Sequence, residues 1–427
     1  MVQAALEAGT AERHCVFETF ARRLPDTRRY GVVAGTGRLL DLLEDFRFGD
    51  DELEALRAQG VVDERTCRWL RDFRFTGDVD GYREGDVYYP GSPVLTVSGT
   101  FAECALLETL VLSVLNHDSA VAAAAARMVV AAGDRPVIEM GSRRTHEESA
   151  IAAARAAYLA GFASTSNLAA GARYGVPTAG TVAHSFILLH DSETDAFRAA
   201  VRAQGTQTTL LVDTYDIREG IRRAVEVAGP DLGAIRIDSG DLAVVAHQAR
   251  AQLDELGAHR TRIVVSGDLD EYAIAALAAA PVDAYGAGTS VVTGSGVPTA
   301  GMVYKLVEVD GRPVAKRSLS KATQGGRKVA VRRHRPSGTS TEEVLRSQAR
   351  PERRPGDRDL QVPLVRKGER VDDGHDLRAA REFHRTARVA LPWDGIKLSR
   401  GEPAIPTTLI PAPPQQGSPE QQGSPQQ

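Results

Sequence analysis

The stretch GAIRIDSGDLAVVAHQARAQLDELGAHRTRIVVSGD, residues 233–268, contains one complete strand–helix–strand unit. An apolar run ends at Asp238, a Ser-Gly turn follows, and an Ala/Arg/Glu-rich stretch then runs to Gly257, where a helix-ending glycine is expected. A second apolar run, TRIVVSG, comes soon after it. Strands and helices that alternate at this spacing predict parallel strands with right-handed crossover connections.

The same alternation extends from Arg135 to about Gly288. Seven apolar runs follow one another, each ending in a polar or glycine-bearing turn: PVIEM, GFAST, PTAGTV, TTLLVD, GAIRID, TRIVVSG and VDAYGAG. About seven such units are more than most open sheets need, so an α/β fold with a closed or nearly closed (β/α) barrel is favoured for residues 101–299. The Ala- and Leu-rich start of this range, residues 101–133, predicts one long or two successive buried helices.

The rest of the chain predicts a second, smaller unit and a tail. Residues 1–100 are interpreted as an α+β domain, joined by strands and helices from about residues 300–410, including a hairpin at Asp310-Gly311. The Arg-, Pro- and Gly-rich segment 334–370 lacks periodicity and is interpreted as loop-rich. Residues 411–427 repeat QQGSP and are expected to be disordered.

Bulk properties narrow the class of protein. The three cysteines, Cys15, Cys67 and Cys104, stand far apart, so neither a disulfide framework nor a zinc site is indicated. No apolar run approaches the roughly 20 residues that cross a bilayer, and the first thirty residues lack a signal-type core. We therefore expect a cytoplasmic protein that binds no membrane.

Charge is unevenly distributed, because Arg and Lys crowd residues 316–358 while the formal net charge is -4. Such a local excess suits a small anion better than a polymer. A nucleic-acid-binding protein stays an alternative, but the stretch lacks the aromatic side chains that stack on bases, and we expect no nucleic acid.

Unusual polar residues follow the carboxyl ends of the apolar runs. In a parallel barrel those ends share one face, which predicts a single pocket. These residues are Arg143, Arg144, Ser166, Asn167, His184, Asp213, Asp238, Asp241, Asp268, Gly288 and Thr289.

Four of these motifs suggest chemistry, each beside a plainer alternative. The run GAGTSVVTGSG, residues 286–296, offers unshielded backbone N–H groups to a phosphate, or is a glycine-rich turn. Asp238 suits ribose hydroxyls or Mg²⁺, whereas Asp241 equally suits a helix cap. His184 is a packed residue, a base or a phosphoryl acceptor. Arg143 and Arg144 are a solvated helix start or an anion clamp.

Taken in order, the motifs EMGSRRTHEESA, STSNLAAGARYGVPTAGTVAHSF, LLVDTYDIREGI, IRIDSGDL, VSGDLDE, YGAGTSVVT and LPWDGIKLSRGEPAIPT resemble the nicotinate phosphoribosyltransferase family. The resemblance extends to about Thr407. It implies an irregular (β/α) barrel of the type II phosphoribosyltransferase kind. It also implies formation of nicotinate mononucleotide and pyrophosphate from nicotinate and 5-phosphoribosyl 1-pyrophosphate in NAD biosynthesis, with Mg²⁺, with ATP hydrolysis coupled through a phosphohistidine, and in a homodimer with shared active sites.

Matched motifs carry the family's site residues onto this chain. His184 resembles the phosphorylated histidine, and the resemblance implies Asp238 as the second catalytic residue. It also implies Mg²⁺ held through the diphosphate, with the Asp238 carboxylate as the candidate protein ligand. Arg143 resembles the residue near nicotinate and pyrophosphate. The remaining substrate-binding residues implied are Arg144, Ser166, Asn167, Asp213, Arg236, Gly267, Asp268, Gly288, Thr289, Lys316, Arg317 and Lys321.

Three alternatives to an active nicotinate phosphoribosyltransferase remain. A quinolinate phosphoribosyltransferase needs extra cations for a second carboxylate and releases carbon dioxide. Nicotinamide-using relatives carry an aspartate near Ser166, so the serine favours the acid. The family also begins with a TDLYxLTM-type segment whose tyrosine stacks on the pyridine, and this chain starts at what resembles its final Met. Either the start codon is assigned too late or the chain is an inactive, truncated paralogue.

Overall fold

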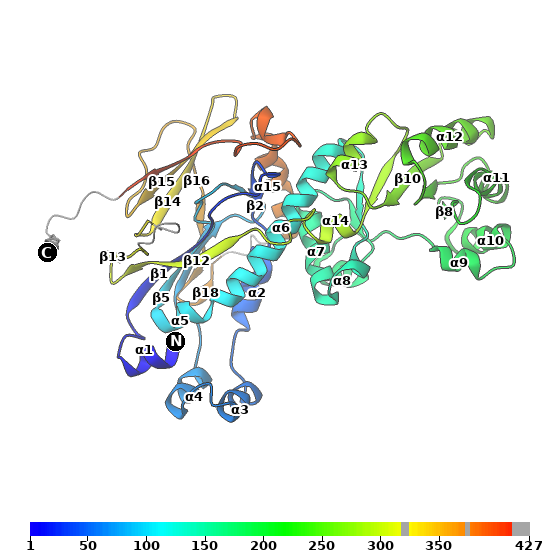
Figure 1. Ribbon diagram of the computed structural model, residues 1–427. Helices are drawn as coiled ribbons and strands as arrows, with labels where there is room; N and C mark the ends of the chain where they lie inside the picture. The colour runs from blue at the N-terminus through cyan, green and yellow to red at the C-terminus, as the bar shows by residue number, and fades with distance from the viewer. Residues whose placement is uncertain (317–323, 372–375, 412–427) are drawn as a thin grey trace, which may run out of the picture.

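The fold is taken from a computed structural model that describes residues 1–316, 324–371 and 376–411. Two sheet systems lie at opposite ends of the molecule, with long helices between them (Figure 1). One system is a parallel sheet formed by the middle of the chain. The other consists of antiparallel sheets in which segments from both ends of the chain lie side by side.

The parallel sheet confirms the predicted fold class. Its six strands lie in the order β7-β6-β11-β10-β9-β8, and every neighbouring pair is parallel. Their bounds are β6 (Val137–Glu139), β7 (Ser164–Thr165), β8 (Thr209–Leu211), β9 (Ala234–Ile237), β10 (Arg262–Gly267) and β11 (Ala284–Ala287).

The ring of strands is open between β7 and β8. Six of the seven apolar runs form strands, whereas PTAGTV, residues 177–182, contributes a single parallel bridge from Thr178 to Thr165. Pro177 has no N–H for a ladder, and Gly180 has no side chain to pack against neighbouring strands. The sheet is therefore a half-barrel.

Helices connect the strands and cover the sheet. Several begin at the expected caps: Ser192 Oγ accepts a hydrogen bond from the N–H of Asp195, and Asp241 accepts one from the N–H of Val244. The plainer interpretation of Asp241 as a cap is thus confirmed. The helices are η1 (Ser142–Arg144), α7 (Glu147–Leu159), α8 (Leu168–Tyr174), α9 (His184–Leu188), α10 (Glu193–Gln204), α11 (Ile217–Ala228), α12 (Leu242–Glu255), α13 (Glu271–Ala276) and α14 (Thr289–Val292).

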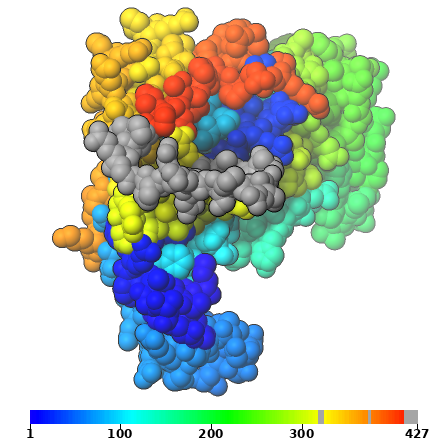
Figure 2. Space-filling view, turned by 60° about the vertical axis from the view of Figure 1, so that its left-hand side comes forward, coloured from blue at the N-terminus to red at the C-terminus, as the bar shows by residue number. Residues whose placement is uncertain are grey.

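The antiparallel part contains a seven-stranded sheet in the order β13-β12-β1-β5-β3-β17-β18, a four-stranded sheet in the order β16-β14-β15-β19, and the pair β2-β4. Figure 2 shows the N-terminal helices standing out from the body. The strands are β1 (His14–Ala21), β2 (Gly31–Val32), β3 (Asp78–Tyr82), β4 (Val87–Tyr88), β5 (Leu95–Thr100), β12 (Met302–Val309), β13 (Arg312–Pro313), β14 (Lys328–His334), β15 (Ser340–Ser347), β16 (Arg358–Asp359), β17 (Gln361–Arg366), β18 (Glu369–Arg370) and β19 (Thr407–Ile410). The helices are α1 (Val2–Glu7), α2 (Thr36–Glu44), α3 (Asp50–Ala58), α4 (Glu64–Arg71), α5 (Phe101–Leu106), α6 (Glu108–Ala132), α15 (Leu377–Val389) and η2 (Trp393–Ile396).

Two expectations for the C-terminal part had different outcomes. The hairpin is confirmed, because β12 pairs with β13 around Asp310 and Gly311, which both have the positive φ of a tight hairpin turn. The loop-rich interpretation of residues 334–370 is wrong, because β15 and β17 lie there. Arg and Glu hide the apolar alternation of β15, and their charges are balanced by ion pairs across the sheet.

Several cations of the basic stretch 316–358 form ion pairs within the part of it that the structure describes. Lys328 pairs with Glu18 at 2.7 Å, and the buried Arg332 pairs with Asp86 at 2.6 Å and with Glu343 at 2.7 Å. These two cations therefore neutralise buried acids of the antiparallel sheets, and their charge is not available to a small anion.

Helix α6 is the central helix of the fold, and it follows α5 as the sequence predicts. The sequence was expected to contain no apolar stretch long enough to cross a membrane, but α6 is long enough and has an 18-residue stretch with a mean hydropathy of 1.2. In the structure 67% of this stretch is buried inside the protein. It contacts α7 and α13 on one side and β2 and β12 on the other. It therefore forms part of the core of both sheet systems.

A buried ion pair joins the two systems. Glu84, between β3 and β4, accepts hydrogen bonds from both Nη atoms of Arg155 on α7, at 2.6 and 2.8 Å, and from the N–H groups of Gly35 and Gly37. Burial alone raises the pKa of Glu84, but these donors outweigh it and hold the pKa below its ordinary value.

Replacing Arg155→Met leaves the Glu84 carboxylate buried without its cation. We expect the free energy of unfolding to fall by about 3–5 kcal/mol in urea titrations near neutral pH. Arg198→Met, which removes an exposed pair with Asp195, is the matched control and should change little. Equal stability of Arg155→Met and the control would contradict the importance of this pair.

Candidate active site

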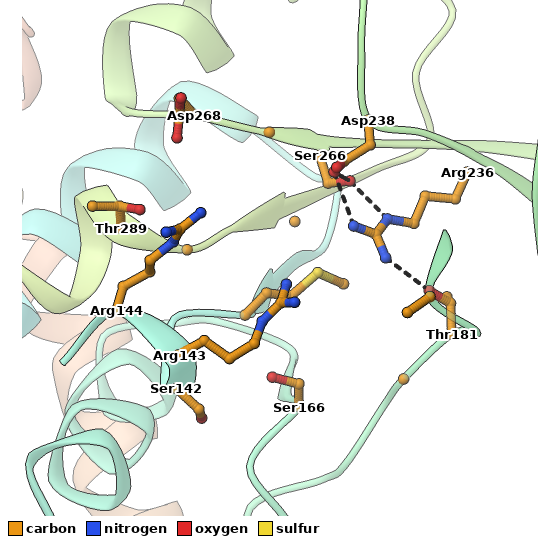
Figure 3. A pocket seen from close by; sticks show the side chains of 16 residues that line it. Ser142, Arg143, Arg144, Ser166, Thr181, Arg236, Asp238, Ser266, Asp268 and Thr289 are labelled. Atoms are coloured by element: carbon orange, nitrogen blue, oxygen red, sulfur yellow. Dashed lines mark hydrogen bonds and ion pairs between the residues drawn. The ribbon is translucent and has the colours of Figure 1, made fainter. Parts of the chain in front are cut away.

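A cavity of about 550 Å³ opens at the carboxyl ends of the parallel strands. It is lined by loops that follow β6, β7, β9, β10 and β11, and by the segment before α9 (Figure 3). The lining residues are Met140, Ser142, Arg143, Arg144, Ser166, Gly180, Thr181, Ala183, Arg236, Asp238, Ser266, Gly267, Asp268, Gly286, Gly288 and Thr289.

Two arginines form the cationic side of the cavity. Arg143 and Arg144 lie in the 3-10 turn η1 after β6, and Figure 3 shows both side chains pointing into the cavity. Neither guanidinium has a hydrogen-bond or ion-pair partner among the residues that the structure describes. Two exposed cations side by side without a carboxylate favour an anionic ligand with several oxygen atoms.

A hydrogen-bonded network faces these arginines. Arg236 donates from Nε to Ser266 Oγ at 2.7 Å and from Nη2 to Asp238 Oδ1 at 2.9 Å, while Nη1 donates to the Thr181 hydroxyl at 2.9 Å. Ser266 Oγ also donates to Asp238 Oδ1 at 2.5 Å. Partial burial raises the pKa of Asp238, but Ser266 and Arg236 outweigh burial and hold it below its ordinary value. The carboxylate is therefore ionised and fixed in position.

His184 lies at the start of α9 beside this network and does not itself line the cavity. Its Nε2 is 3.2 Å from Oδ1 of the buried Asp213, and the imidazole is 42% exposed. The other oxygen of Asp213 accepts hydrogen bonds from the N–H of Asp238 and from Ser239 Oγ, both at 2.8 Å. One buried carboxylate thus orients His184 and holds the turn that carries Asp238.

Glycines bring backbone close to the cavity. A Cβ on Gly286 would lie 2.8 Å from Met140 Sδ, and a Cβ on Gly141 would lie 2.8 Å from the carbonyl oxygen of Gly288. Gly267 has a φ of +131°, which side-chain-bearing residues rarely adopt. The loops after β6, β10 and β11 therefore pack together with their main chains exposed to a ligand.

The structure brings most of the predicted site residues to this one cavity. Nine of them line it: Arg143, Arg144, Ser166, Arg236, Asp238, Gly267, Asp268, Gly288 and Thr289. Asn167 lies next to it but caps α8 through the N–H of Ala170, and its Nδ2 donates to Ser142. Lys316 does not line the cavity and follows β13, an edge strand of the seven-stranded antiparallel sheet. Arg317 and Lys321 lie outside the described residues, as do residues 412–427 of the predicted tail.

Sequence reasoning missed several lining residues and one support. Met140, Ser142, Gly180, Thr181, Ala183, Ser266 and Gly286 also line the cavity. Ser266 could have been found from the sequence, because it directly precedes the predicted Gly267-Asp268 turn. Thr181 gave no such signal, because it lay in a segment predicted to be a strand. The buried Glu139 accepts hydrogen bonds from the Gly141 N–H and the Thr165 hydroxyl. Burial raises the pKa of this carboxyl.

Comparison with known protein families accounts for both halves of this architecture. Residues 1–116 match the nicotinate phosphoribosyltransferase N-terminal domain, and residues 121–296 match the quinolinate phosphoribosyl transferase C-terminal domain. The nicotinate phosphoribosyltransferase pncB1 of Mycobacterium tuberculosis is 63% identical over 96% of this chain and 93% of its own length. The chain belongs to the nicotinate phosphoribosyltransferase family.

Other members of the family and their structures agree. The nicotinate phosphoribosyltransferase of Bacillus subtilis is 37% identical over 76% of this chain and 69% of its own length. The crystal structure of human nicotinic acid phosphoribosyltransferase superposes with a TM-score of 0.84, at 26% identity and 96% coverage of both chains. The nicotinate-nucleotide pyrophosphorylase structure from Pyrococcus furiosus gives 0.77, at 25% identity, covering 91% of this chain and 93% of its own.

Close backbone packing in this family member can be tested at Gly141. In Gly141→Ala the new Cβ would lie 2.3 Å from Val292 Cγ1, so η1 must move away from the loop after β11. We expect affinity for inorganic pyrophosphate at the cavity to fall at least tenfold, or about 1.4 kcal/mol, in calorimetric titrations. Gly180→Ala adds a methyl group to the same cavity without any atom within 4 Å and should have a smaller effect. Unchanged affinity in a folded Gly141→Ala protein would contradict the model of packed loops.

Proposed function

We propose that the protein transfers the phosphoribosyl group of 5-phosphoribosyl 1-pyrophosphate to the ring nitrogen of nicotinate. The bond from the anomeric carbon to the pyrophosphate oxygen breaks, and pyrophosphate leaves with the electron pair. The pyridine nitrogen supplies the pair for the new bond, which gives nicotinate mononucleotide. The observation that carries this proposal is the placement of Arg143 and Arg144 opposite the fixed Asp238 in one cavity, with no carboxylate partner for either arginine in the described part of the chain.

The arrangement matches the charges of such a transfer. The anomeric carbon passes through an oxocarbenium-like state, so positive charge develops on the sugar while negative charge grows on the leaving group. The arginines neutralise the pyrophosphate, and the ionised Asp238 suits ribose hydroxyls and the cationic sugar. Backbone N–H groups beside Gly267 and Gly288 suit the 5-phosphate. Holding both reactants in one cavity removes much of the entropic cost of bringing them together.

Two features support nicotinate as the acceptor. Ser166 adds no negative charge to the cavity, so the carboxylate of nicotinate meets hydroxyl groups and arginines there. The relatives that match along most of the chain are named as nicotinate enzymes, whereas the quinolinate family model matches only residues 121–296. Quinolinate and nicotinamide remain the acceptors to compare.

We further propose that ATP phosphorylates His184. The γ-phosphoryl group would pass to an imidazole nitrogen with release of ADP, and hydrolysis of the phosphohistidine would follow the transfer reaction. The exposed imidazole beside the cavity supports this, as does its orientation by Asp213. Because Nε2 faces Asp213, Nδ1 is the nitrogen that accepts the phosphoryl group.

Mg²⁺ fits the cavity as a companion of the diphosphate. The described residues contain no cluster of three or more His, Cys, Asp or Glu side chains suited to a metal ion. Mg²⁺ commonly uses one or two carboxylates together with substrate phosphates. Asp268, and the Asp238 oxygen that is not bonded to Arg236, are the carboxylate groups available in the cavity. Bound there, the ion would neutralise pyrophosphate oxygens.

A homodimer with shared active sites completes the proposal, together with a cytoplasmic location. Lys316, which resembles a phosphate-binding residue of the family, follows β13, and β13 is remote from the cavity of its own chain (Figure 1). It can serve such a role only in the cavity of a second subunit.

Phosphorylation of His184 is tested with γ-labelled ATP. We expect acid-labile label on the wild-type protein and none on His184→Ala. His190→Ala is a matched control, because His190 lies close by, at the end of α9, and its Nδ1 contacts the carbonyl oxygen of Phe186. Label that persists in His184→Ala would exclude the phosphohistidine but leave phosphoribosyl transfer open.

The acceptor is tested by comparing nicotinate, nicotinamide and quinolinate with the same sugar donor. We expect nicotinate to react with the highest kcat/KM. In Ser166→Asp the new charge should lower kcat/KM for nicotinate at least tenfold, about 1.4 kcal/mol, and should spare nicotinamide. Ser166→Asn is the control of similar size without charge. Turnover of quinolinate alone would overturn the proposed acceptor.

A further inference from the structure

A second, smaller cavity lies away from the candidate active site, along one face of α15. Its volume is about 170 Å³, and it lies between α15, the carboxyl end of α7 and α6. The candidate active site adjoins the opposite end of α7, where Arg144 precedes its first turn. The second cavity is lined by Val129, Ala160, Gly161, Arg378, Arg381, Glu382, His384, Arg385 and Arg388.

Four arginines with one acidic neighbour line this small space. Arg378, Arg381, Arg385 and Arg388 recur every three or four residues, so they share one helical face. Glu382 pairs with Arg385 at 2.7 Å and is the one acid among the described residues that line the cavity. Like charges at this spacing repel one another and destabilise an isolated helix. An anion bound among these arginines would reduce that repulsion.

Arg381 is held in place by the carboxyl end of α7. Its guanidinium donates hydrogen bonds to the carbonyl oxygens of Tyr158, Gly161 and Phe162, and it lies over the Tyr158 ring at 4.4 Å. Burial and the nearby Arg388 lower the pKa of Arg381 below its ordinary value. This arginine thus fixes α15 against α7 and adds positive charge at the bottom of the cavity.

Two buried nitrogen atoms lack partners at the same place. His384 is 1% exposed, its Nδ1 contacts the carbonyl oxygen of Gly85 at 2.9 Å, and its Nε2 has no partner among the described residues. Nη1 of Arg388 is likewise buried without a partner. Unsatisfied buried polar groups are costly, and they are usually matched by a ligand or water.

We propose that this cavity on α15 is a second anion-binding site that takes a small phosphate-bearing ligand. The arginines supply charge and hydrogen bonds from several directions, which matches the tetrahedral oxygens of a phosphate group. His384 Nδ1 donates to the Gly85 carbonyl oxygen, so Nε2 is an acceptor and meets a ligand hydroxyl. Burial lowers the pKa of His384 to about 4, so the imidazole is neutral before the ligand binds and accepts a hydrogen bond from a ligand hydroxyl. The site goes beyond phosphoribosyl transfer and does not depend on it.

The test counts pyrophosphate ions bound per chain by isothermal titration of the full-length protein with inorganic pyrophosphate. We expect two equivalents in the wild type. The double variant Arg378→Ala/Arg385→Ala changes two exposed side chains and should remove one equivalent, or weaken it at least tenfold. Arg143→Ala should remove the other equivalent, so the failure of either site is seen separately.

Controls separate this outcome from general loss of charge or of fold. Arg202→Ala removes an exposed arginine on α10, outside the cluster on α15, and it should keep both equivalents. Arg388→Met keeps the length of the side chain and should also lose the second equivalent while the circular dichroism spectrum is unchanged. Retention of both equivalents in the double variant and in Arg388→Met overturns the proposal. A change of molecular mass in Arg388→Met without loss of pyrophosphate binding also overturns it, because the cluster is then a subunit contact.

Discussion

The candidate site depends on one constraint, which is that all six strands of the half-barrel run in the same direction. Their carboxyl ends meet at a single edge, so turns separated by about 150 residues in sequence line one cavity. Arg143 follows β6, and Asp238 follows β9. Two strands, β11 and β10, lie between β6 and β9 in the sheet. Neither residue needs a long side-chain reach, because the strand direction has already brought the turns together.

The same residue type has opposite uses in the two sheet systems. Arg332 is 1% exposed and pairs with Asp86 and Glu343. These two carboxylates neutralise its charge within the antiparallel sheets. Arg143 and Arg144 are exposed at the cavity and have no such carboxylate among the described residues. Buried pairs contribute geometry at the cost of desolvation, whereas arginines at a cavity keep their charge for a ligand. Counting arginines along the sequence therefore does not locate an anion site.

The sequence predicts well what depends on local pattern and chain direction. Six of the seven strands predicted from the strand–helix alternation form, and the edge at which Arg236 and Asp238 lie was also predicted, because periodicity and turn position are local properties. It did not predict that residues 177–182 add only one bridge to the edge strand β7, because the apolar pattern outweighed the missing N–H of Pro177 and the missing side chain of Gly180. The sequence also could not distinguish Asp213, a buried residue that contacts His184, from the residues that line the cavity. That difference is one of side-chain direction, which only the packed sheet determines.

Asp213 shows why this difference matters for the proposed ATP-coupled reaction. With the phosphoryl group on Nδ1 of His184, Nε2 would keep its proton and donate a hydrogen bond to the Asp213 carboxylate. This hydrogen bond would stabilise the phosphorylated imidazole. The second oxygen of Asp213 holds the N–H of Asp238, so any shift of the carboxylate toward the phosphorylated ring changes the turn that faces the sugar. In the proposed reaction this single buried acid would therefore couple His184 to Asp238.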